Sequence, residues 1–162
     1  YSKRDARCYF DSLKAPSALT QFFGRPAILV SDLLAHSDFT LDALENFVDD
    51  ATERLSCSDF LHPVSTCWPQ GFSWSSYVAQ ENTLAVCAKA GVLESVILSL
   101  DHPMPSDQSE LVAVCTDDVI CMHTDRTAAS IRVARLDEEM QAAGIIKNAT
   151  KDVDQELFVT RL

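Results

Sequence analysis

One short stretch decides the fold: Leu-Val-Ala-Val-Cys-Thr-Asp-Asp-Val-Ile-Cys-Met, residues 111–122. Apolar, mostly β-branched residues flank the pair Asp117 and Asp118, a pattern typical of two strands joined by a tight turn. We therefore predict strands at 111–116 and 119–123, with both acids at the tip of the hairpin. The apolar strands are buried and fix the backbone, while the turn carries the two carboxylates out to the edge of the sheet.

Three helices are predicted around this hairpin. Thr40 is a favourable N-cap for a helix over 41–55. A second helix is expected from about Trp74 to Ala90, with Gly91 as its stop, and a third from about Thr127 to Ala143, ended by Gly144. The apolar positions expected to face the core are Leu41, Leu44, Val48, Ala51 and Leu55 in the first helix, Trp74, Tyr77, Val78, Leu84, Ala85 and Ala88 in the second, and Val133, Leu136, Met140 and Ala143 in the third.

Two further strands complete the pattern, at residues 1–6 and at 156–160. The segment 92–100 fits either a helix or a strand. When the helix at 41–55 is set aside, the order becomes β-α-β-β-α-β, the split βαβ arrangement. We therefore predict an α+β, ferredoxin-like fold over 1–162, a single domain with a four-stranded antiparallel sheet and helices on one face.

Composition limits the classes of function. The chain has 162 residues, of which 47% are hydrophobic and 23% charged, as in a globular domain. No apolar run approaches the roughly 20 residues of a membrane helix, so we expect no membrane partner. The 6 cysteines show no zinc-binding spacing, and we interpret them as reduced thiols, mostly in the core. This indicates an intracellular protein, with cytoplasm and nucleus both left open.

A third acid makes a metal site the leading interpretation of the hairpin tip. Asp5 lies where the first strand should end, and in a split βαβ sheet that strand neighbours the central hairpin. Asp5 and Asp117 are therefore expected to converge, and convergent carboxylates need a cation between them. Hard oxygen ligands suit Mg²⁺ or Mn²⁺, and two such ions serve phosphoryl transfer. On the hairpin alone, a simple polar turn remains the alternative.

Four segments, in this order, resemble the palm motifs of reverse transcriptases of the retrotransposon type. The first is Asp-Ala-Arg-Cys-Tyr-Phe-Asp-Ser-Leu at 5–13, and the second is Pro-Gln-Gly-Phe-Ser-Trp-Ser at 69–75. The third is Cys-Thr-Asp-Asp at 115–118, and the fourth is Gly-Ile-Ile-Lys-Asn-Ala-Thr-Lys at 144–151. The resemblance covers the palm only, so most of the fingers are expected before Tyr1 and the thumb after Leu162.

The resemblance implies roles for particular residues. Asp5 and Asp117 would be the ligands of two Mg²⁺ or Mn²⁺ ions, with Asp118 in a supporting place. Phe10 would lie under the incoming sugar and exclude a 2′-hydroxyl. Tyr9 competes for that position, and a core aromatic is the alternative for Phe10.

Other segments receive weaker assignments. Gln70 and Gly71 would shape the floor below nucleotide and template, unless they simply form a turn before a helix. Lys151 would approach the triphosphate, or else is a solvated surface lysine. Trp74 is interpreted as a core residue, with a platform for base stacking as the alternative. Cys115 replaces the aromatic residue of the third motif, which puts the placement of the primer end in doubt.

The function implied by the resemblance is RNA-directed DNA polymerisation, with an RNA or DNA template-primer and a deoxynucleoside triphosphate as partners. The net charge of −11 opposes phosphate binding, so we expect this fragment to bind nucleic acid weakly and to be inactive by itself. A catalytically inactive palm that acts as a protein-interaction module is the alternative. An unrelated ferredoxin-like binding domain is a third interpretation.

Overall fold

The computed structural model describes residues 1–48, 54–106, 109–154 and 156. In it the chain forms two compact units, one made of Tyr1–Lys14 with Cys67–Leu162 and the other of Ala15–Thr66. The range 1–162 that the sequence assigns to one palm domain thus contains both units. The first unit carries all of the predicted site residues.

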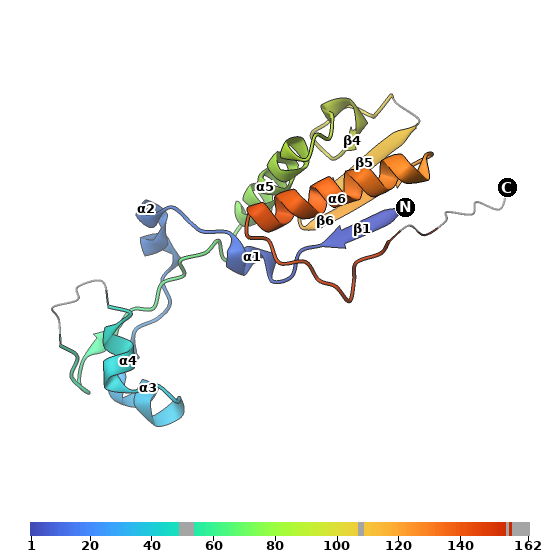
Figure 1. Ribbon diagram of the computed structural model, residues 1–162. Coiled ribbons are helices and arrows are strands. Elements are labelled where there is room, and N and C mark those ends of the chain that lie inside the picture. The colour runs from blue at the N-terminus through green and yellow to red at the C-terminus, as the bar shows by residue number, and fades with distance from the viewer. Residues whose placement is uncertain (49–53, 107–108, 155, 157–162) are drawn as a thin grey trace. The chain divides into compact units, whose positions relative to one another are not determined.

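A four-stranded sheet forms the centre of the first unit (Figure 1). Its strand order is β1 (Ser2–Asp5), β6 (Asp118–His123), β5 (Glu110–Cys115) and β4 (Ile97–Leu98). The first three strands are antiparallel to their neighbours, which confirms the α+β class, but β4 runs parallel to β5. The expected all-antiparallel sheet is therefore wrong at this edge, because the chain loops back after β4 before it enters β5 in the same direction.

The opposite edge of the sheet is covered by the segment 147–153. Val153 and Lys147 form antiparallel bridges with Lys3 and Ala6, on the side of β1 that faces away from β6. This segment takes the edge position that we expected a strand at 156–160 to fill. Of that predicted strand, only Glu156 is described and it is not in a strand; the rest lies outside the described residues.

The two long helices match their predicted limits closely: α5 spans Ser75–Lys89 and α6 spans Arg126–Ala142. Gly91 and Gly144 end them as predicted, with φ of +77° and +73°. These left-handed conformations suit glycine, and after each glycine the next amide bonds back to a carbonyl of the last turn. At the other end of α6, the side chain of Asp125 accepts a hydrogen bond from the amide of Ala128.

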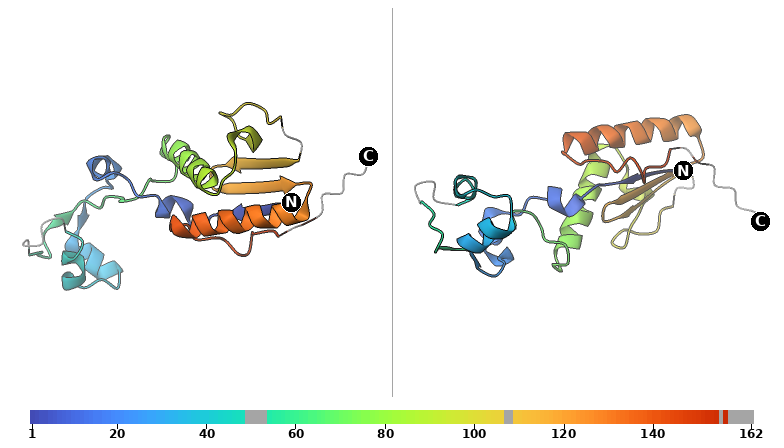
Figure 2. Two further views of the ribbon diagram at one scale, coloured as in Figure 1. Left: turned by 45° about the horizontal axis from the view of Figure 1, so that its top comes forward. Right: turned by 90° about the horizontal axis from the view of Figure 1, so that it is seen from below.

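Both helices pack on one face of the sheet (Figures 1 and 2). Three of the four predicted inner residues of α6 are buried, and Ala143 is the exception. The sheet residues in this shared core are Ile97, Val112, Val114, Val119 and Cys121.

The inner face predicted for α5 is wrong for most of its residues: of the six, Leu84 is partly buried against the core, and none is fully buried. Its buried residues are Ser75, Ala79, Thr83, Val86 and Cys87. Trp74 and Tyr77 were expected inside, yet they are 61% and 54% exposed. Small residues line the inner face and let the helix lie close to the sheet, while the large aromatic rings project from the opposite side. The two aromatic residues therefore pointed the prediction to the wrong face of this helix.

The second unit is built from short elements around a small core of Val30, Leu44 and Leu55. Its elements are α2 (Ser17–Thr20), η1 (Gln21–Phe23), β2 (Ile28–Leu29), α3 (Val30–His36), α4 (Leu41–Glu45) and β3 (Phe60–Leu61). The strands β2 and β3 pair antiparallel.

The helix predicted over 41–55 begins as expected but ends early. The Thr40 hydroxyl accepts a hydrogen bond from the Ala43 amide, which confirms the cap. The helix α4 stops at Glu45, whose carboxylate accepts a hydrogen bond from the Leu55 amide and pairs with Arg54. Residues 49–53 of the predicted helix lie outside the described part.

The cysteines are less buried than expected. Cys87 and Cys121 lie in the core, where burial raises the pKa of their thiols to about 12 and about 11. Cys8, Cys57 and Cys115 are exposed, so the prediction that most cysteines fill the core is wrong. As to membranes, none of the helices in the described ranges has the length and apolar character that a bilayer-spanning segment needs.

Candidate functional site

Two of the predicted acids lie directly opposite each other on neighbouring strands. Asp5 of β1 pairs with Asp118 of β6. The Ala6 amide donates to the Asp117 carbonyl at 3.3 Å, so the next pair along the ladder, Asp5 with Asp118, is of the non-hydrogen-bonded kind. Side chains approach each other most closely in such pairs. Both carboxylates extend from the face of the sheet that α5 and α6 leave uncovered.

The hairpin turn is shifted by one residue from its predicted position. We expected Asp117 and Asp118 at the tip, but β5 ends at Cys115 and β6 begins at Asp118. The two turn residues are therefore Thr116, with φ +55°, and Asp117. As a result, the acid that faces Asp5 is Asp118, which the sequence ranked below Asp117.

Asp5 is buried and held by the segment 147–153. Asn148 donates from Nδ2 to Asp5 Oδ1 at 3.0 Å, and Lys151 Nζ lies 3.4 Å from Asp5 Oδ2. The backbone of Asp5 is fixed as well, because its amide donates to Asp152 and its carbonyl accepts from the Asn148 amide. Burial favours the protonated form of Asp5, but contacts with Asn148 and Lys151 outweigh it and hold the pKa of Asp5 below its ordinary value.

Asp118 has a lysine beside it. Lys3 Nζ lies 2.9 Å from Asp118 Oδ1, and this pairing raises the pKa of Lys3 above its ordinary value. The same oxygen is buried and accepts no hydrogen bond of good geometry. Lys3 and Asp5 are two residues apart on β1, so both lie on the same face of the sheet. One lysine, Lys3, and two aspartates, Asp5 and Asp118, therefore share a small area of that face.

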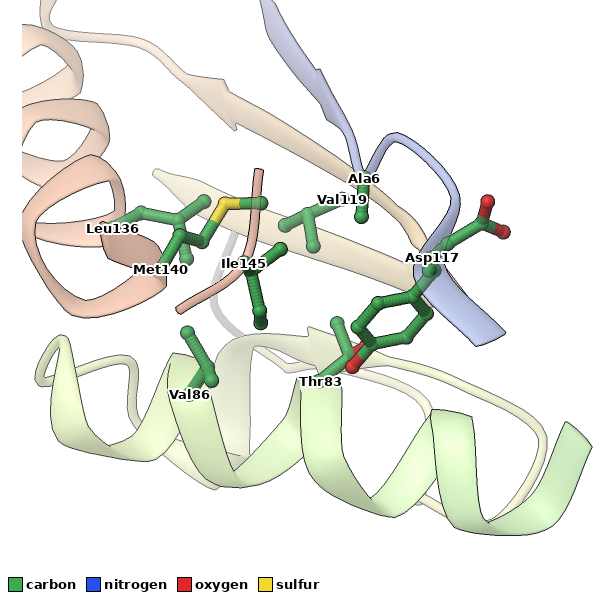
Figure 3. A pocket seen from close by; sticks show the side chains of 9 residues that line it. Ala6, Thr83, Val86, Asp117, Val119, Leu136, Met140 and Ile145 are labelled. Carbon is green, nitrogen blue, oxygen red and sulfur yellow. The ribbon is translucent and has the colours of Figure 1, made fainter. Parts of the chain in front are cut away.

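Asp117 stands at the margin of a small apolar cavity of about 10 Å³ between α5, α6 and the sheet. Thr83, Leu136 and Met140 point into this cavity, whereas the carboxylate of Asp117 points away from it (Figure 3). A cavity of this size holds one water at most, so it is a packing gap and no ligand site. Partial burial, and then the charges of Asp118 and Asp5, raise the pKa of Asp117 above its ordinary value.

This electrostatic cost gives a first prediction. Asp117→Asn should raise the free energy of unfolding at pH 7 by about 0.5 kcal/mol, the size of a like-charge contact across a sheet. Because the folded state raises the pKa of Asp117, its cost is present when the carboxylate is ionised and disappears as the pH falls through that pKa. Urea unfolding at pH 7 and near pH 3.5 measures the difference. Asp101→Asn, in an exposed loop, is the control, and a neutral or destabilising Asp117→Asn at pH 7 contradicts the charge repulsion.

The chemistry of these oxygens suits a divalent cation, although the side chains are not gathered tightly. In the described ranges no three His, Cys, Asp or Glu side chains come close enough together to hold a metal ion. What the structure does bring together is a facing pair, Asp5 and Asp118, with Asp117 next in the chain. Two ammonium groups, those of Lys3 and Lys151, lie where a cation would balance these charges.

The two aromatic candidates lie on α1 (Tyr9–Ser12), directly after β1. Tyr9 is 3% exposed, and its hydroxyl bonds to Asn82 at 2.8 Å and to Thr83 at 2.9 Å, so its ring belongs to the core. Phe10 is half-buried and packs against the edge of that core. Of the two, Phe10 therefore keeps surface open to a ligand.

Of the other predicted residues, all within the described ranges, Lys151 contacts an acid of the site, whereas Gln70 and Gly71 do not. Lys151 lies beside Asp5 and is 62% exposed. Gln70 and Gly71 are exposed in the turn before α5, where Gly71 has φ +90°, and among the described residues no hydrogen bond joins them to the acids. Trp74, expected in the core, is exposed close by. Cys115 is exposed and lies opposite Asp118 in the ladder.

Three residues of the site were missed from the sequence: Lys3, Asn148 and Asp152. Alternation along β1 puts Lys3 on the face of Asp5, a signal that was present but not used. Asn148 stands three residues before Lys151 in the fourth motif and received no role there. The contact between Asp152 and the Asp5 amide depends on how the segment 147–153 meets β1, which no local pattern indicates.

Comparison with known proteins adds nothing to this picture. No family model matches the chain, and a search of curated proteins finds no similar sequence. The case for a function therefore rests on the geometry and chemistry of the site itself.

Proposed function

We propose that this chain is the palm of an RNA-directed DNA polymerase, and that Asp5, Asp117 and Asp118 form its acidic centre. The observation that carries the proposal is the direct pairing of Asp5 with Asp118 across neighbouring strands. The four segments that resemble palm motifs support it, since three of them contribute residues to this one place. The order of the edge segment 147–153, β1, β6 and β5 is also the order of a ferredoxin-like split βαβ sheet.

The donor set fits Mg²⁺ or Mn²⁺, which bind hard carboxylate oxygens. Asp5 and Asp118 would hold the ions with Asp117 as a third ligand, and an ion at Asp118 Oδ1 would take the place of the Lys3 ammonium group. Two bound ions supply activation of the attacking primer 3′-hydroxyl and stabilisation of the charge on the transferred phosphoryl group.

The remaining residues would act on the substrates. Lys151 carries an exposed ammonium group beside Asp5, from which it can donate a proton or balance charge at the leaving pyrophosphate. Phe10 presents its half-buried ring as a steric limit under the sugar of a deoxynucleoside triphosphate. Gln70 and Gly71 offer an amide and an accessible backbone to the nucleotide and template. Because the net charge is −11, firm binding of a template-primer needs basic surface that this chain itself supplies poorly.

A second function is favoured by the ion pairs in the same place. Lys3 and Lys151 already balance charge on Asp118 and Asp5, as they would in a palm that has lost catalysis and serves as a protein-interaction module. The exposed aromatic residues near the start of α5 would then be part of a contact surface. The two functions differ in one property, which is whether a divalent cation displaces the lysines.

Thermal unfolding with Mn²⁺ or Mg²⁺ separates the two functions. Under the polymerase proposal, Mn²⁺ should raise the melting temperature, with about 2.7 kcal/mol of stabilisation at 100 times the dissociation constant. Asp118→Asn should abolish the shift, while Asp101→Asn should leave it intact. No shift in the unchanged chain would exclude the ion site and favour the interaction module.

The lysine beside Asp118 allows a sharper version of this experiment. Lys3→Met should lower the Mn²⁺ concentration that gives half of the thermal shift by about three- to fivefold. This is equivalent to about 0.6–1 kcal/mol, the upper range for a partly exposed ion pair. The matched control is Lys89→Met, an exposed lysine on α5. An unchanged or raised Mn²⁺ requirement in Lys3→Met would mean that the lysine does not compete with the cation.

A further inference from the structure

The hairpin turn that carries the acids is bonded to α5 through the peptide groups of Val114 and Thr116. Gln80 uses its whole amide group: Oε1 accepts from the Thr116 amide at 2.6 Å, and Nε2 donates to the Val114 carbonyl at 3.3 Å. One turn later on the same helix, the hydroxyl of Thr83 donates to the Thr116 carbonyl. The peptide groups around Thr116 are thus held by two side chains of α5.

This turn has a backbone conformation that needs support. Thr116 has φ +55°, which a β-branched residue rarely adopts. Such conformations persist where the surroundings hold them. In the described part of the chain only one other residue that is not glycine has a positive φ, and this is Cys8, at φ +49°. Cys8 stands in the connection between β1, which ends at Asp5, and α1.

The same turn of α5 also holds that second segment, through Tyr9. The hydroxyl of Thr83 lies within hydrogen-bond distance of two carbonyls, that of Thr116 and, at 3.0 Å, that of Ala79, and the contact with Thr116 is the shorter. The Tyr9 hydroxyl lies 2.9 Å from the hydroxyl of Thr83 and 3.3 Å from the same Ala79 carbonyl. The Tyr9 oxygen in turn accepts from Asn82 Nδ2 at 2.8 Å. Hydrogen bonds therefore connect Asn82, Tyr9, Thr83 and Thr116 in one group, which joins α5 to both segments.

We infer that Gln80 and Thr83 are positioning residues for the facing acids. They hold the Thr116–Asp117 turn, and through Tyr9 the segment after Asp5, at a fixed distance from one helix. This sets the register in which Asp118 faces Asp5. It also accounts for a threonine at the centre of the inner face of α5, where an apolar residue would fill space but hold neither segment. For catalysis the inference rests on the proposed function; for the geometry of the acids it stands by itself.

The experiment uses the whole chain in four variants: Gln80→Ala, Thr83→Val, Thr83→Ser and, as a control on the exposed side of α5, Glu81→Gln. Two nuclear magnetic resonance readouts report geometry without any metal. They are the exchange rate of the Thr116 amide and the cross-strand nuclear Overhauser effect between the α protons of Asp5 and Asp118, which are close in a non-hydrogen-bonded pair. A third readout is the Mn²⁺ concentration at half of the thermal shift.

The expected result has the pattern of a rescue. Gln80→Ala should speed exchange of the Thr116 amide at least tenfold, and both Gln80→Ala and Thr83→Val should weaken the Asp5–Asp118 effect. Each should also raise the Mn²⁺ requirement by about tenfold, as loss of a residue that orients a metal ligand does. Thr83→Ser, which keeps the hydroxyl, and Glu81→Gln should behave like the unchanged chain.

Other results overturn the inference. If the cross-strand effect is unchanged in Gln80→Ala, the bonds from Gln80 do not set the register of Asp5 and Asp118. This conclusion holds even if Thr83→Val fails to fold. If the geometry changes but the Mn²⁺ requirement does not, the two residues do not position the acids for a cation. If Mn²⁺ does not shift the melting temperature of the unchanged chain, the proposed function is excluded. The two resonance readouts then test the positioning role of Gln80 and Thr83 by themselves.

Discussion

Arg4→Met is expected to lower the free energy of unfolding by about 3 kcal/mol, because it removes one partner of a buried ion cluster. Arg4 is 5% exposed, and its guanidinium pairs with Asp137 of α6 at 2.7 Å and with Asp154 at 2.7 Å. It also donates to the carbonyls of Lys3 and Val153. A single side chain therefore connects β1, α6 and the edge segment 147–153.

The loss should appear as a fall of about 6–12 °C in the melting temperature, from the usual 2–4 °C per kcal/mol at this size. Asp154→Asn is the matched control: Asp154 is 74% exposed, so losing its pair with Arg4 should cost under about 0.5 kcal/mol. Arg4→Lys keeps the charge but not the two-pronged hydrogen bonding, and should fall between them. If Arg4→Met melts like the unchanged chain, the cluster does not hold these elements together.

The effect should depend on pH in a stated direction. Burial opposes ionisation of Asp137, but Arg4 and Lys147 outweigh it and lower the pKa of this carboxyl. A lowered pKa in the folded state gives stability that is present above the ordinary pKa and lost as the pH falls through the folded value. The difference between Arg4→Met and the unchanged chain should therefore shrink in acid, below about pH 4.

The elements of the first unit were predictable where apolar spacing and special glycines agree. The helix α6 shows both, with Val133, Leu136 and Met140 on one side and Gly144 as its stop. The helix α5 has equally clear limits but an inner face of Ser75, Ala79 and Thr83. Small residues carry little hydrophobic signal, so the spacing rule selected Trp74 and Tyr77 on the exposed side. On α5, the buried positions are those where the helix lies close to the sheet and where side chains form hydrogen bonds, and they are not the positions of the largest apolar residues.

The errors in the site have a similar origin. The order of elements along the chain predicts that β1 lies beside the hairpin, and the structure confirms this, since β1 pairs with β6. The position of the turn does not follow, because the preference of aspartate for turns favours 117–118, whereas bonds from Gln80 and Thr83 hold the turn at 116–117. Those bonds join residues more than 30 positions apart, beyond the reach of a local rule. The predicted end of the helix over 41–55 is wrong for the same reason, since Glu45, the last residue of α4, bonds to a residue ten positions later.

The largest expected effect is on catalysis. Under the proposed function, Asp5→Ala and Asp118→Ala should each lower kcat for primer extension by the full-length protein about a thousandfold, with little change in KM for the nucleotide. The reason is that the carboxylates act on charge that develops in the transition state more than on ground-state binding. Single-turnover extension of a labelled primer on an RNA template measures this. Asp101→Ala should extend at the unchanged rate.

The shifted hairpin makes this prediction more discriminating than loss of activity alone. Because Asp118, and not Asp117, faces Asp5, Asp117→Asn should lose less activity than Asp118→Asn, although Asp117 is nearer to the tip of the turn. The opposite order would mean that the acids work in the register expected from the sequence. Extension that persists in Asp5→Ala or in Asp118→Ala would show that the facing pair does not hold the ions. The stability of the same variants keeps the explanations apart, since a variant that melts normally but does not extend has lost chemistry and not its fold.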